Sequence, residues 1–375
     1  MPSVSLIVCF HNAESTIERT LRSLREQTAS DVEFIFVNDG STDRSAEVIK
    51  TFMALNPDFA KRHKLIRTNH GGLAHAYHIG IDNASGQYLM RCDADDYLEP
   101  EAVSIMVAEA EATDADIVVC PFFSESSYRT HIEQFRNRPA SLNDFAIDTL
   151  HFAIWNKLFR RELLTAHDSL PFDGVDCWED LGVVSRLMAL SPRIAYVDRP
   201  LYHYVQQPAS LSRSHKDRIL FDHLKMALLL EDWFLHNTPQ GKFDTFLRHL
   251  KFASKVKLLR RPNRDVARWK STFPEVNSSI LSLRHVPLHY RLLFAAAALL
   301  PTSLTQAVAN TFDKLFHSRN SRTLPWLNTT TSANGASSSP ATISSAKAMP
   351  YLKATSAPAT MSLTSLPSGA TRWHS

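Results

Sequence analysis

The chain has 375 residues, of which 44% are hydrophobic and 21% are charged, and its formal net charge at pH 7 is +3. This length and apolar content are sufficient for two domains, or for one large domain with a sizeable core. Because the net charge is close to zero, the composition gives no general signature of a polyanion-binding protein and does not indicate a nucleic-acid partner.

The first hundred residues alternate between short apolar runs and helical stripes. The runs typical of strands are residues 4–10, 32–37, 64–67 and 87–92, and the helical patterns are residues 13–27, 46–52 and 73–83. This alternation predicts a parallel sheet covered by helices. In such sheets the ligand crevice lies beyond the carboxyl ends of the strands.

From residue 101 to residue 213 the pattern is mixed. It contains a helix, a strand candidate at 117–120, an aromatic segment at 152–159 and a helix near 180–190. We expect this region to form the other half of the active-site cleft. Tyr202, His203 and Tyr204 fall in a predicted strand, where a lone histidine is more often structural than a ligand.

Residues 217–316 are predicted to be mostly helical. The longest apolar stretch, 292–309, is interrupted by Pro301 and by polar residues, so we expect an interfacial or buried helix here and no membrane span. After Asp313 there is no acidic residue, and from residue 318 onward Ser, Thr, Ala and Pro dominate. This composition predicts a disordered tail.

Basic residues concentrate between residues 251 and 270 of the helical region, with Asp265 as the only acid among them. Two interpretations stay open: contact with anionic lipid headgroups, or an ordinary solvated helix face. The basic residues are Lys251, Lys255, Lys257, Arg260, Arg261, Arg264, Arg268 and Lys270.

The cysteines and the N-terminus indicate a cytoplasmic protein, with the inner face of the membrane as an alternative position. Cys9, Cys92, Cys120 and Cys177 show no CxxC pairing, which favours buried reduced thiols in a reducing compartment. The N-terminus opens directly into a strand pattern without the features of a secretion signal.

Two carboxylates follow the fourth predicted strand at alternate positions, Asp93 and Asp95. A bend there would let both reach one hard cation, Mg²⁺ or Mn²⁺, which also accepts phosphate oxygens. A nucleoside diphosphate fits that chemistry. The alternative is a solvated turn or a helix cap that includes Asp96. Because the pair directly follows a buried strand, we favour the functional interpretation.

Asp39 lies at the exit of the second predicted strand, where Gly40 permits a sharp turn. Its carboxylate could accept a hydrogen bond from the N–H of a base. The alternative is a cap of the next helix, and for Thr42 and Asp43 we favour that role.

Trp178, Glu179 and Asp180 precede a stretch with apolar residues at helical spacing. An acidic pair at a helix N-terminus can simply cap the helix and complement its dipole. The functional alternative is a general base that deprotonates an acceptor hydroxyl.

These segments together resemble family 2 of the glycosyltransferases, an inverting family with the GT-A fold, and in particular its bacterial members that build surface polysaccharides. That fold is α/β, with a Rossmann-like, mostly parallel sheet flanked by helices. The resemblance covers about residues 2–214. It is strongest in residues 4–12, VNDGSTDRS at 37–45, residues 69–96, WNKLF at 155–159, LYHY at 201–204 and SLSRS at 210–214.

The resemblance implies a role for each acidic residue. Asp39 would contact uracil or another base, Asp93 and Asp95 would contact the ribose and the metal-bound diphosphate, and Asp180 would be the catalytic base with Glu179 beside it. Asp95 would be the ligand of Mg²⁺ or Mn²⁺. The other residues expected at the donor or acceptor are Cys9, Phe10, Asn12, Glu14, Tyr77, Ala94, Asn156, Lys157 and Trp178.

The sequence also departs from the family pattern. Members usually carry Arg and then Asn where this chain has Tyr77 and His78, and Cys9 stands where Thr is frequent. These changes question the identity of the donor more than the activity. Between Trp155 and Phe159, we expect the apolar side chains in the core, with Asn156 and Lys157 as weaker candidates for acceptor contact.

The expected organisation is a nucleotide-sugar-binding half at 1–110, an acceptor-side half at 111–214, a helical extension with possible membrane contact at 215–317 and a low-complexity tail at 318–375. The resemblance implies a UDP-sugar or similar donor and a saccharide or lipid-linked acceptor. One rival is an inactive nucleotide-binding or scaffold protein of the same fold. A second, an Asp-dependent phosphotransferase, is disfavoured because the first strand ends in Cys9, Phe10 and His11 without an Asp nucleophile.

Overall fold

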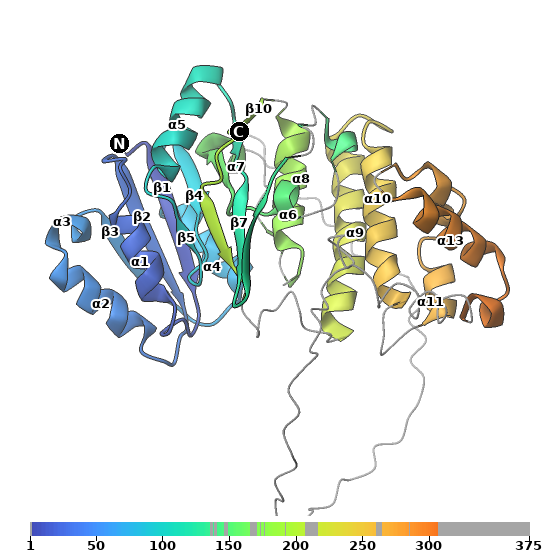
Figure 1. The fold of residues 1–375 in the computed structure, drawn as a ribbon, viewed down its shortest axis with the longest axis horizontal. Coiled ribbons are helices and arrows are strands. Elements are labelled where there is room, and N and C mark those ends of the chain that lie inside the picture. Colours follow the sequence, from blue (N-terminus) through green and yellow to red (C-terminus); the bar gives the residue numbers. More distant parts are fainter. Residues whose placement is uncertain are drawn as a thin grey trace, which may run out of the picture. The chain divides into compact units, whose positions relative to one another are not determined.

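The computed structural model contains a seven-stranded sheet with the order β10-β6-β9-β4-β1-β2-β3, which lies in the left half of Figure 1. The structure describes residues 2–306 except 136–137, 139–140, 146–148, 166–170, 173, 176, 192, 207–216, 260–264 and 285. The strands are β1 Val4–Phe10, β2 Val32–Asp39, β3 His63–Thr68, β4 Tyr88–Arg91, β6 Ile117–Val119, β9 Lys157–Arg160 and β10 Ile194–Tyr196.

Strands β1 to β4 are parallel, as the alternating pattern predicts. The register places Phe10 opposite Asn38 and Ile7 opposite Arg91, so β1, β2 and β4 end at the same edge of the sheet. Strand β9 is antiparallel to both β4 and β6, which the sequence did not indicate. The sheet is therefore mostly parallel, and both acidic loops leave it at the carboxyl edge.

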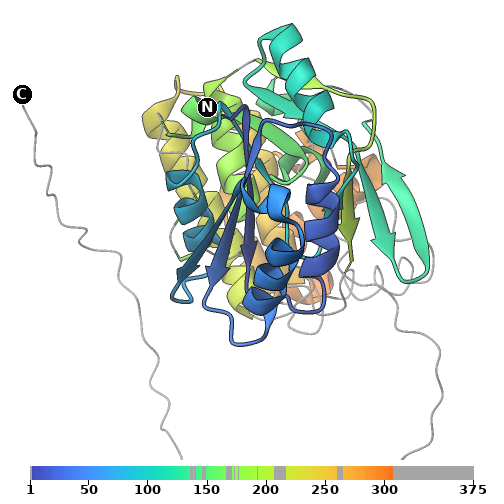
Figure 2. The same cartoon turned by 90° about the vertical axis from the view of Figure 1, so that its left-hand side faces the viewer.

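Helices cover both faces of this sheet (Figures 1 and 2). Along β1, Leu6 and Val8 belong to one core and Ile7 and Cys9 to the other, which explains the continuous apolar run in the sequence. One face packs against α1 Ile17–Arg25, α2 Ser45–Leu55, α3 Pro57–Ala60 and α5 Ala102–Thr113. The core on the other face includes side chains of α4 Leu73–Asp82, α6 Thr149–Phe152, α7 Arg161–Thr165 and α8 Glu179–Leu190, and α9 Asp217–Asn237 and α10 Asp244–Val256 extend this core beyond α8.

A second sheet of four strands has the order β5-β11-β7-β8. We did not predict it as a separate sheet. Strand β11 pairs in parallel with β7 and antiparallel with β5. The strands are β5 Tyr97–Leu98, β7 Phe122–Ser126, β8 Arg129–Glu133 and β11 Tyr202–Val205.

His203 in β11 has the structural role that we expected for it. Its ring stacks on Tyr97 and on Phe123, with centroid distances of 4.0 and 4.4 Å. Its two ring nitrogens lie 2.7 Å from Glu99 Oε1 and 2.8 Å from Glu125 Oε1. His203 thus contacts side chains in β7 and in or next to β5, and these contacts stabilise the second sheet.

The region after residue 217 is helical as far as it is described. Besides α9 and α10 it contains α11 Val266–Ser271, α12 Pro274–Asn277 and α13 Leu288–Leu299, and the chain has short 3-10 helices at Leu142–Asp144, Lys257–Leu259 and Ile280–Ser282. Helix α13 buries Tyr290, Phe294 and Ala297, whereas Leu292 and Leu299 are exposed, so the helix is buried on one side only. Within the described ranges, no helix has the length and apolar character needed to cross a membrane.

Two lysines of the basic region are not on a solvated or lipid-facing surface, so both of our interpretations are wrong for them. Lys251 is buried and its Nζ lies 2.5 Å from Glu231 Oε1 and 2.7 Å from Glu275 Oε1. Lys255 is fully buried and donates to Asn277 Oδ1 at 2.7 Å. Arg260, Arg261, Arg264, SLSRS at 210–214 and the tail at 318–375 lie outside the described residues.

Candidate active site

A buried arginine joins the acidic loop after β4 to the start of α8. Arg91, the last residue of β4, is 3% exposed. Its Nε donates to Asp93 Oδ1 at 2.7 Å, and its Nη1 donates to Asp180 Oδ1 at 3.0 Å. The other oxygen of Asp180 accepts from the backbone N–H of Ile154 at 3.2 Å. The structure therefore brings together Asp93 and Asp180, which we predicted as parts of one site.

Arg91 itself was missed in the sequence. The available signal was a charged residue at the end of an otherwise apolar strand. Such a residue is expensive to bury unless it is paired, so its position implies acidic partners nearby. Asp93, two residues on, is the evident partner, but the sequence offers nothing that connects Arg91 to Asp180.

The acidic pair at the start of α8 has raised pKa values. Burial raises the pKa of Asp180, the charge of Arg91 opposes this rise, Asp93 adds to it, and Lys157 acts in the same direction as Arg91. Burial, followed by the charge of Asp180, raises the pKa of Glu179 to about 8. Because Arg91 contacts Asp180 directly, the pair carries its negative charge preferentially on Asp180.

The acidic loop after β4 is held in place by the second sheet. Asp96 is buried and accepts from Tyr202 Oη and from Val205 N, both at 2.7 Å. Tyr202 Oη in turn accepts from the backbone N–H of Asp93 at 3.1 Å. Asp96 therefore has a structural role, whereas Asp93 and Asp95 remain the candidates for binding a cation.

The surroundings of Asp95 favour the binding of a proton or a cation by its carboxylate. Burial, and then the charge of Asp93, raises the pKa of Asp95 to about 6. Helix α1 secures the backbone of this loop, because Thr20 Oγ1 donates to Ala94 O at 3.1 Å and Arg19 Nη2 donates to Asp95 O at 2.5 Å. The carboxylates of Asp93 and Asp95 form an oxygen-rich donor set that suits Mg²⁺ or Mn²⁺.

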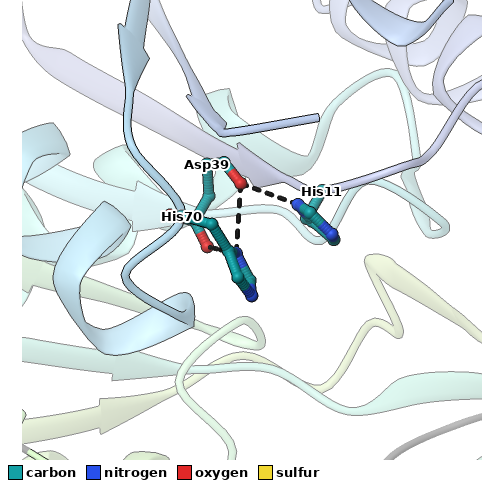
Figure 3. Close-up of side chains that lie close together, drawn as sticks. All are labelled: His11, Asp39 and His70. Atoms are coloured by element: carbon teal, nitrogen blue, oxygen red, sulfur yellow. Dashed lines mark hydrogen bonds and ion pairs between the residues drawn. The ribbon is translucent and has the colours of Figure 1, made fainter. Parts of the chain in front are cut away.

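At the end of β2, Asp39 lies against two histidines (Figure 3). Its Oδ1 accepts from Gly71 N at 2.7 Å, and its Oδ2 accepts from Gly72 N at 2.9 Å and lies 2.8 Å from His70 Nδ1. The Nδ1 atom of His11 lies 2.7 Å from the carbonyl oxygen of Asp39. These contacts do not use the full hydrogen-bonding capacity of Asp39, because a carboxylate oxygen has more than one lone pair. Contact between Asp39 and a base stays a prediction.

The histidine partners of Asp39 were not expected from the sequence. The rings of His11 and His70 are stacked, with centroids 4.2 Å apart. His11 follows β1 and His70 follows β3, so both come from loops at the carboxyl edge where Asp39 ends β2. The only available signal was their position directly after two predicted parallel strands.

The loop after β1 is tied to the loop after β2. Asn12, at a positive φ of 53°, accepts on its Oδ1 from Thr42 N at 2.9 Å. Glu14 Oε1 accepts from Arg44 Nε at 2.9 Å. The N-cap residue of α2 is Arg44, so our prediction that Thr42 and Asp43 cap this helix is wrong, although Asp43 Oδ1 does accept from the first backbone N–H of α2 at 3.0 Å. These contacts place Asn12 and Glu14 at the carboxyl edge, and their contact with a donor stays a prediction.

Three other expected residues lie at or beneath this edge. Phe10 packs in the core on the α1 face. Burial raises the pKa of Cys9 to about 12, and the charges of Arg91, Asp93 and Asp39 have smaller effects on it. The ring of Tyr77 faces the guanidinium of Arg91 at 5.6 Å, and its buried hydroxyl has no hydrogen-bond partner among the described residues.

On the acceptor side, Trp155 is in the core as expected. Asn156 and Lys157 are fully buried, with Asn156 Nδ2 donating to Cys120 O at 2.9 Å and Lys157 Nζ donating to Ala153 O at 2.5 Å. These internal contacts do not favour a role at the acceptor, which stays a prediction.

Trp178 precedes α8 with a φ of 67°. This left-handed conformation is strained for a bulky residue and occurs preferentially at functional sites. The edge of the Trp178 ring meets the ring of His223, with centroids 4.2 Å apart. The strained turn thus lies directly before Glu179 and Asp180.

Comparison with known proteins identifies the family. The model described as "Glycosyl transferase family 2" matches residues 5–168. The chain is 33% identical over 238 residues to the "Uncharacterized glycosyltransferase EpsJ" of Bacillus subtilis (strain 168), and the match covers 60% of this chain and 67% of the relative.

Solved structures share the fold at low sequence identity. S. aureus TarS 1–349 in complex with UDP matches with a TM-score of 0.60 and 17% identity, covering 86% of this chain and 93% of that chain. The mannosyltransferase PcManGT from Pyrobaculum calidifontis, in complex with GDP-Man and Mn²⁺, matches with a TM-score of 0.51 and 18% identity, covering 85% and 88%. The chain has the GT-A architecture, and it matches both the family model and EpsJ of Bacillus subtilis. It therefore belongs to glycosyl transferase family 2 and is a glycosyltransferase.

Proposed function

We propose that the enzyme transfers a sugar, with inversion, from a nucleotide-sugar such as a UDP-sugar to a hydroxyl of a saccharide or lipid-linked acceptor, in the synthesis of a surface polysaccharide. The observation that carries this proposal is the double contact of Arg91 with Asp93 and Asp180. It supports a site in which a catalytic base and a diphosphate-binding loop lie side by side.

Asp180 is the proposed general base. It has one oxygen fixed by Arg91 and the other by the backbone of Ile154, so its carboxylate is oriented before any substrate binds. A carboxylate whose pKa is raised accepts a proton more readily than an ordinary one, which suits a general base. The partly exposed side chain, 19% accessible, keeps it within reach of solvent-borne ligands.

Asp93 and Asp95 are the proposed holders of Mg²⁺ or Mn²⁺. Their all-oxygen donor set and the raised pKa of Asp95 fit a divalent cation. When bound, such an ion would neutralise charge that develops on the leaving diphosphate. PcManGT, which shares the fold, has Mn²⁺ in its complex. We propose that the nucleotide base of the donor binds beside Asp39, at the carboxyl end of β2. The complex of TarS with UDP supports a nucleotide donor.

The proposed reaction is a single displacement. The acceptor hydroxyl gives its proton to the Asp180 carboxylate while its oxygen forms a bond to the anomeric carbon of the donor. The bond from that carbon to the diphosphate oxygen breaks, and its electron pair leaves with the nucleoside diphosphate. Attack from the opposite face inverts the anomeric configuration.

The test is release of UDP from a panel of UDP-sugars with oligosaccharide or lipid-linked acceptors, in Mn²⁺ or Mg²⁺ and in EDTA. We expect turnover that requires the metal and that is lost in Asp180→Asn and in Asp95→Ala. Asp232→Asn, which changes an exposed carboxylate of α9, is the matched control and should retain full turnover. Absence of nucleotide binding in the native protein would contradict the proposal.

Tyr77 favours a second candidate, a nucleotide-binding protein of this fold without catalysis. It stands where family members usually carry Arg, and its buried hydroxyl has no partner among the described residues. Metal-dependent binding of UDP with no product from any donor and acceptor pair would support this candidate. Turnover that depends on Asp180 would exclude it.

A further inference from the structure

We propose that His11, Asp39 and His70 form a second cation site, separate in chemistry from Asp93 and Asp95, that binds a borderline divalent ion such as Zn²⁺ (Figure 3). Each of the three residues can offer a ligand atom, and these atoms lie within 4.8 Å of one another. Two imidazoles and a carboxylate are a donor set typical of protein-bound zinc.

The separations between donor atoms suit a single ion. His70 Nδ1 lies 2.8 Å from Asp39 Oδ2 and 3.2 Å from Asp39 O, and His11 Nδ1 lies 2.7 Å from the same carbonyl oxygen. Ligand atoms bound tetrahedrally to one ion at about 2.1 Å are about 3.4 Å apart, so the two exposed imidazoles would have to move away from Asp39 by roughly 0.6 Å. On binding, the ion would take the place of the hydrogen-bonded protons between the two imidazoles and Asp39.

The carboxylate is fixed in advance. The backbone N–H groups of Gly71 and Gly72 donate to the two oxygens of Asp39 at 2.7 and 2.9 Å, which orients it as an outer hydrogen-bond shell orients metal ligands. Gly40 has a φ of +64°, and a Cβ there would lie 2.7 Å from His70 N. Glycine at position 40 therefore permits the close approach of His70 to Asp39.

The two cation sites select different ions. Mg²⁺ prefers oxygen ligands, so it is expected at Asp93 and Asp95 and not beside two imidazoles. The side chain of His70 is 60% exposed, and His11 is exposed as well, so an ion and its waters can enter from solvent. Asp39, in contrast, is buried, which gives the site one rigid ligand and two adjustable ones.

One consequence rests on the proposed function. Asp39 is also the proposed contact of the nucleotide base, so an ion held by Asp39 and the two histidines would exclude the base. We therefore expect Zn²⁺ to weaken the binding of UDP and to act as an inhibitor that excess Mg²⁺ does not reverse.

The test is calorimetric titration of the full chain with Zn²⁺ in a large excess of Mg²⁺ and without nucleotide. We expect His70→Ala and His11→Ala to weaken Zn²⁺ binding at least about tenfold. Asp95→Ala should keep the native affinity. So should His131→Ala, since His131 is a partly exposed histidine of β8 that pairs only with Glu133 among the described residues. Equal affinity in the native protein and both His variants would overturn the site.

Two further measurements complete the test. Circular dichroism melting shows whether each variant is folded, and the absorption of bound Co²⁺, lost in His70→Ala but not in Asp95→Ala, reports imidazole ligands independently of affinity. UDP binding is then measured in Mg²⁺ with and without Zn²⁺. Unchanged UDP binding at saturating Zn²⁺ would overturn the competition, whereas failure of UDP to bind without Zn²⁺ would contradict the proposed function and leave the zinc result intact.

Discussion

Arg91 Nη1 lies 3.0 Å from Asp180 Oδ1, although 89 positions separate the two residues in the chain. The same guanidinium holds Asp93, so one buried cation serves two carboxylates. This arrangement places a positive charge next to the proposed base, whose side chain stays 19% exposed. It also links the protonation of Asp180 to the charge of the loop that is proposed to hold the metal.

The first prediction separates the two acidic residues at the start of α8. Asp180→Asn keeps the shape and removes the base, so we expect the rate of transfer to fall by about 10²–10⁴-fold while UDP still binds. Glu179→Gln is the matched control, because a pKa of about 8 leaves Glu179 mostly protonated at neutral pH and Gln resembles that form. We expect this change to lower the rate less than about tenfold. The reverse ranking would assign the base to Glu179.

The second prediction concerns pH. A general base must be deprotonated, and the pKa of Asp180 is raised, so the decrease of kcat/KM with falling pH should begin above the ordinary pKa of an Asp carboxyl, about 3.9. Arg91 lowers this pKa, so Arg91→Gln should move the acidic limb of the profile to higher pH. The measurement is kcat/KM against pH for both proteins, and coincident limbs would show that Arg91 does not tune the base.

Much of the fold could be predicted because the apolar runs are long. The run at 4–10 coincides with β1, and the acidic loops leave the carboxyl edge as expected. The second sheet was missed because β5 has only two residues and β8 is mostly exposed, so neither gives a clear alternation. The buried lysine Lys251 was misread because its partners, Glu231 and Glu275, are distant in sequence.

The site shows the same limit. Asp39, Asp93 and Asp180 could be found because each lies where a strand ends or a helix begins. Arg91 and His70 also lie at or just after strand ends, but their partners could not be found, because these contacts join segments that the sequence does not order in space. The local sequence pattern thus predicts which edge of the sheet contains the active site, whereas the balance of charges at that edge depends on tertiary packing.

The third prediction concerns the attachment of the acidic loop to the second sheet. Tyr202 Oη donates to Asp96 Oδ2 at 2.7 Å and accepts from Asp93 N at 3.1 Å, and the residue is fully buried. Tyr202→Phe leaves both groups without this partner and should lower the free energy of unfolding by about 1–3 kcal/mol. Urea unfolding measures the change. Tyr128→Phe, at an exposed tyrosine, is the control and should have no effect.

The last prediction tests a partly buried carboxylate of β2, Glu33, which we expect to stabilise the sheet. Burial opposes the ionisation of Glu33, but hydrogen bonds from Ser5, Ser85 and Lys64 outweigh it and lower its pKa from 4.5 to about 2. The Glu33 side chain is 13% exposed, and its Oε1 accepts from Ser5 Oγ and from Ser85 N, both at 2.6 Å. The ionised form is thus favoured by folding.

A folded pKa below the unfolded one means that stability is fully present above about 4.5 and is lost as the pH falls towards about 2. A shift of this size corresponds to roughly 3 kcal/mol, and because glutamine retains part of the hydrogen bonding we expect Glu33→Gln to cost about 2 kcal/mol at pH 7. The difference from the native protein should shrink in urea unfolding series below pH 4.5, whereas Glu111→Gln, at an exposed position on α5, should show no difference at any pH. A cost for Glu33→Gln that does not change with pH would show that lost packing, and not the charge, is responsible.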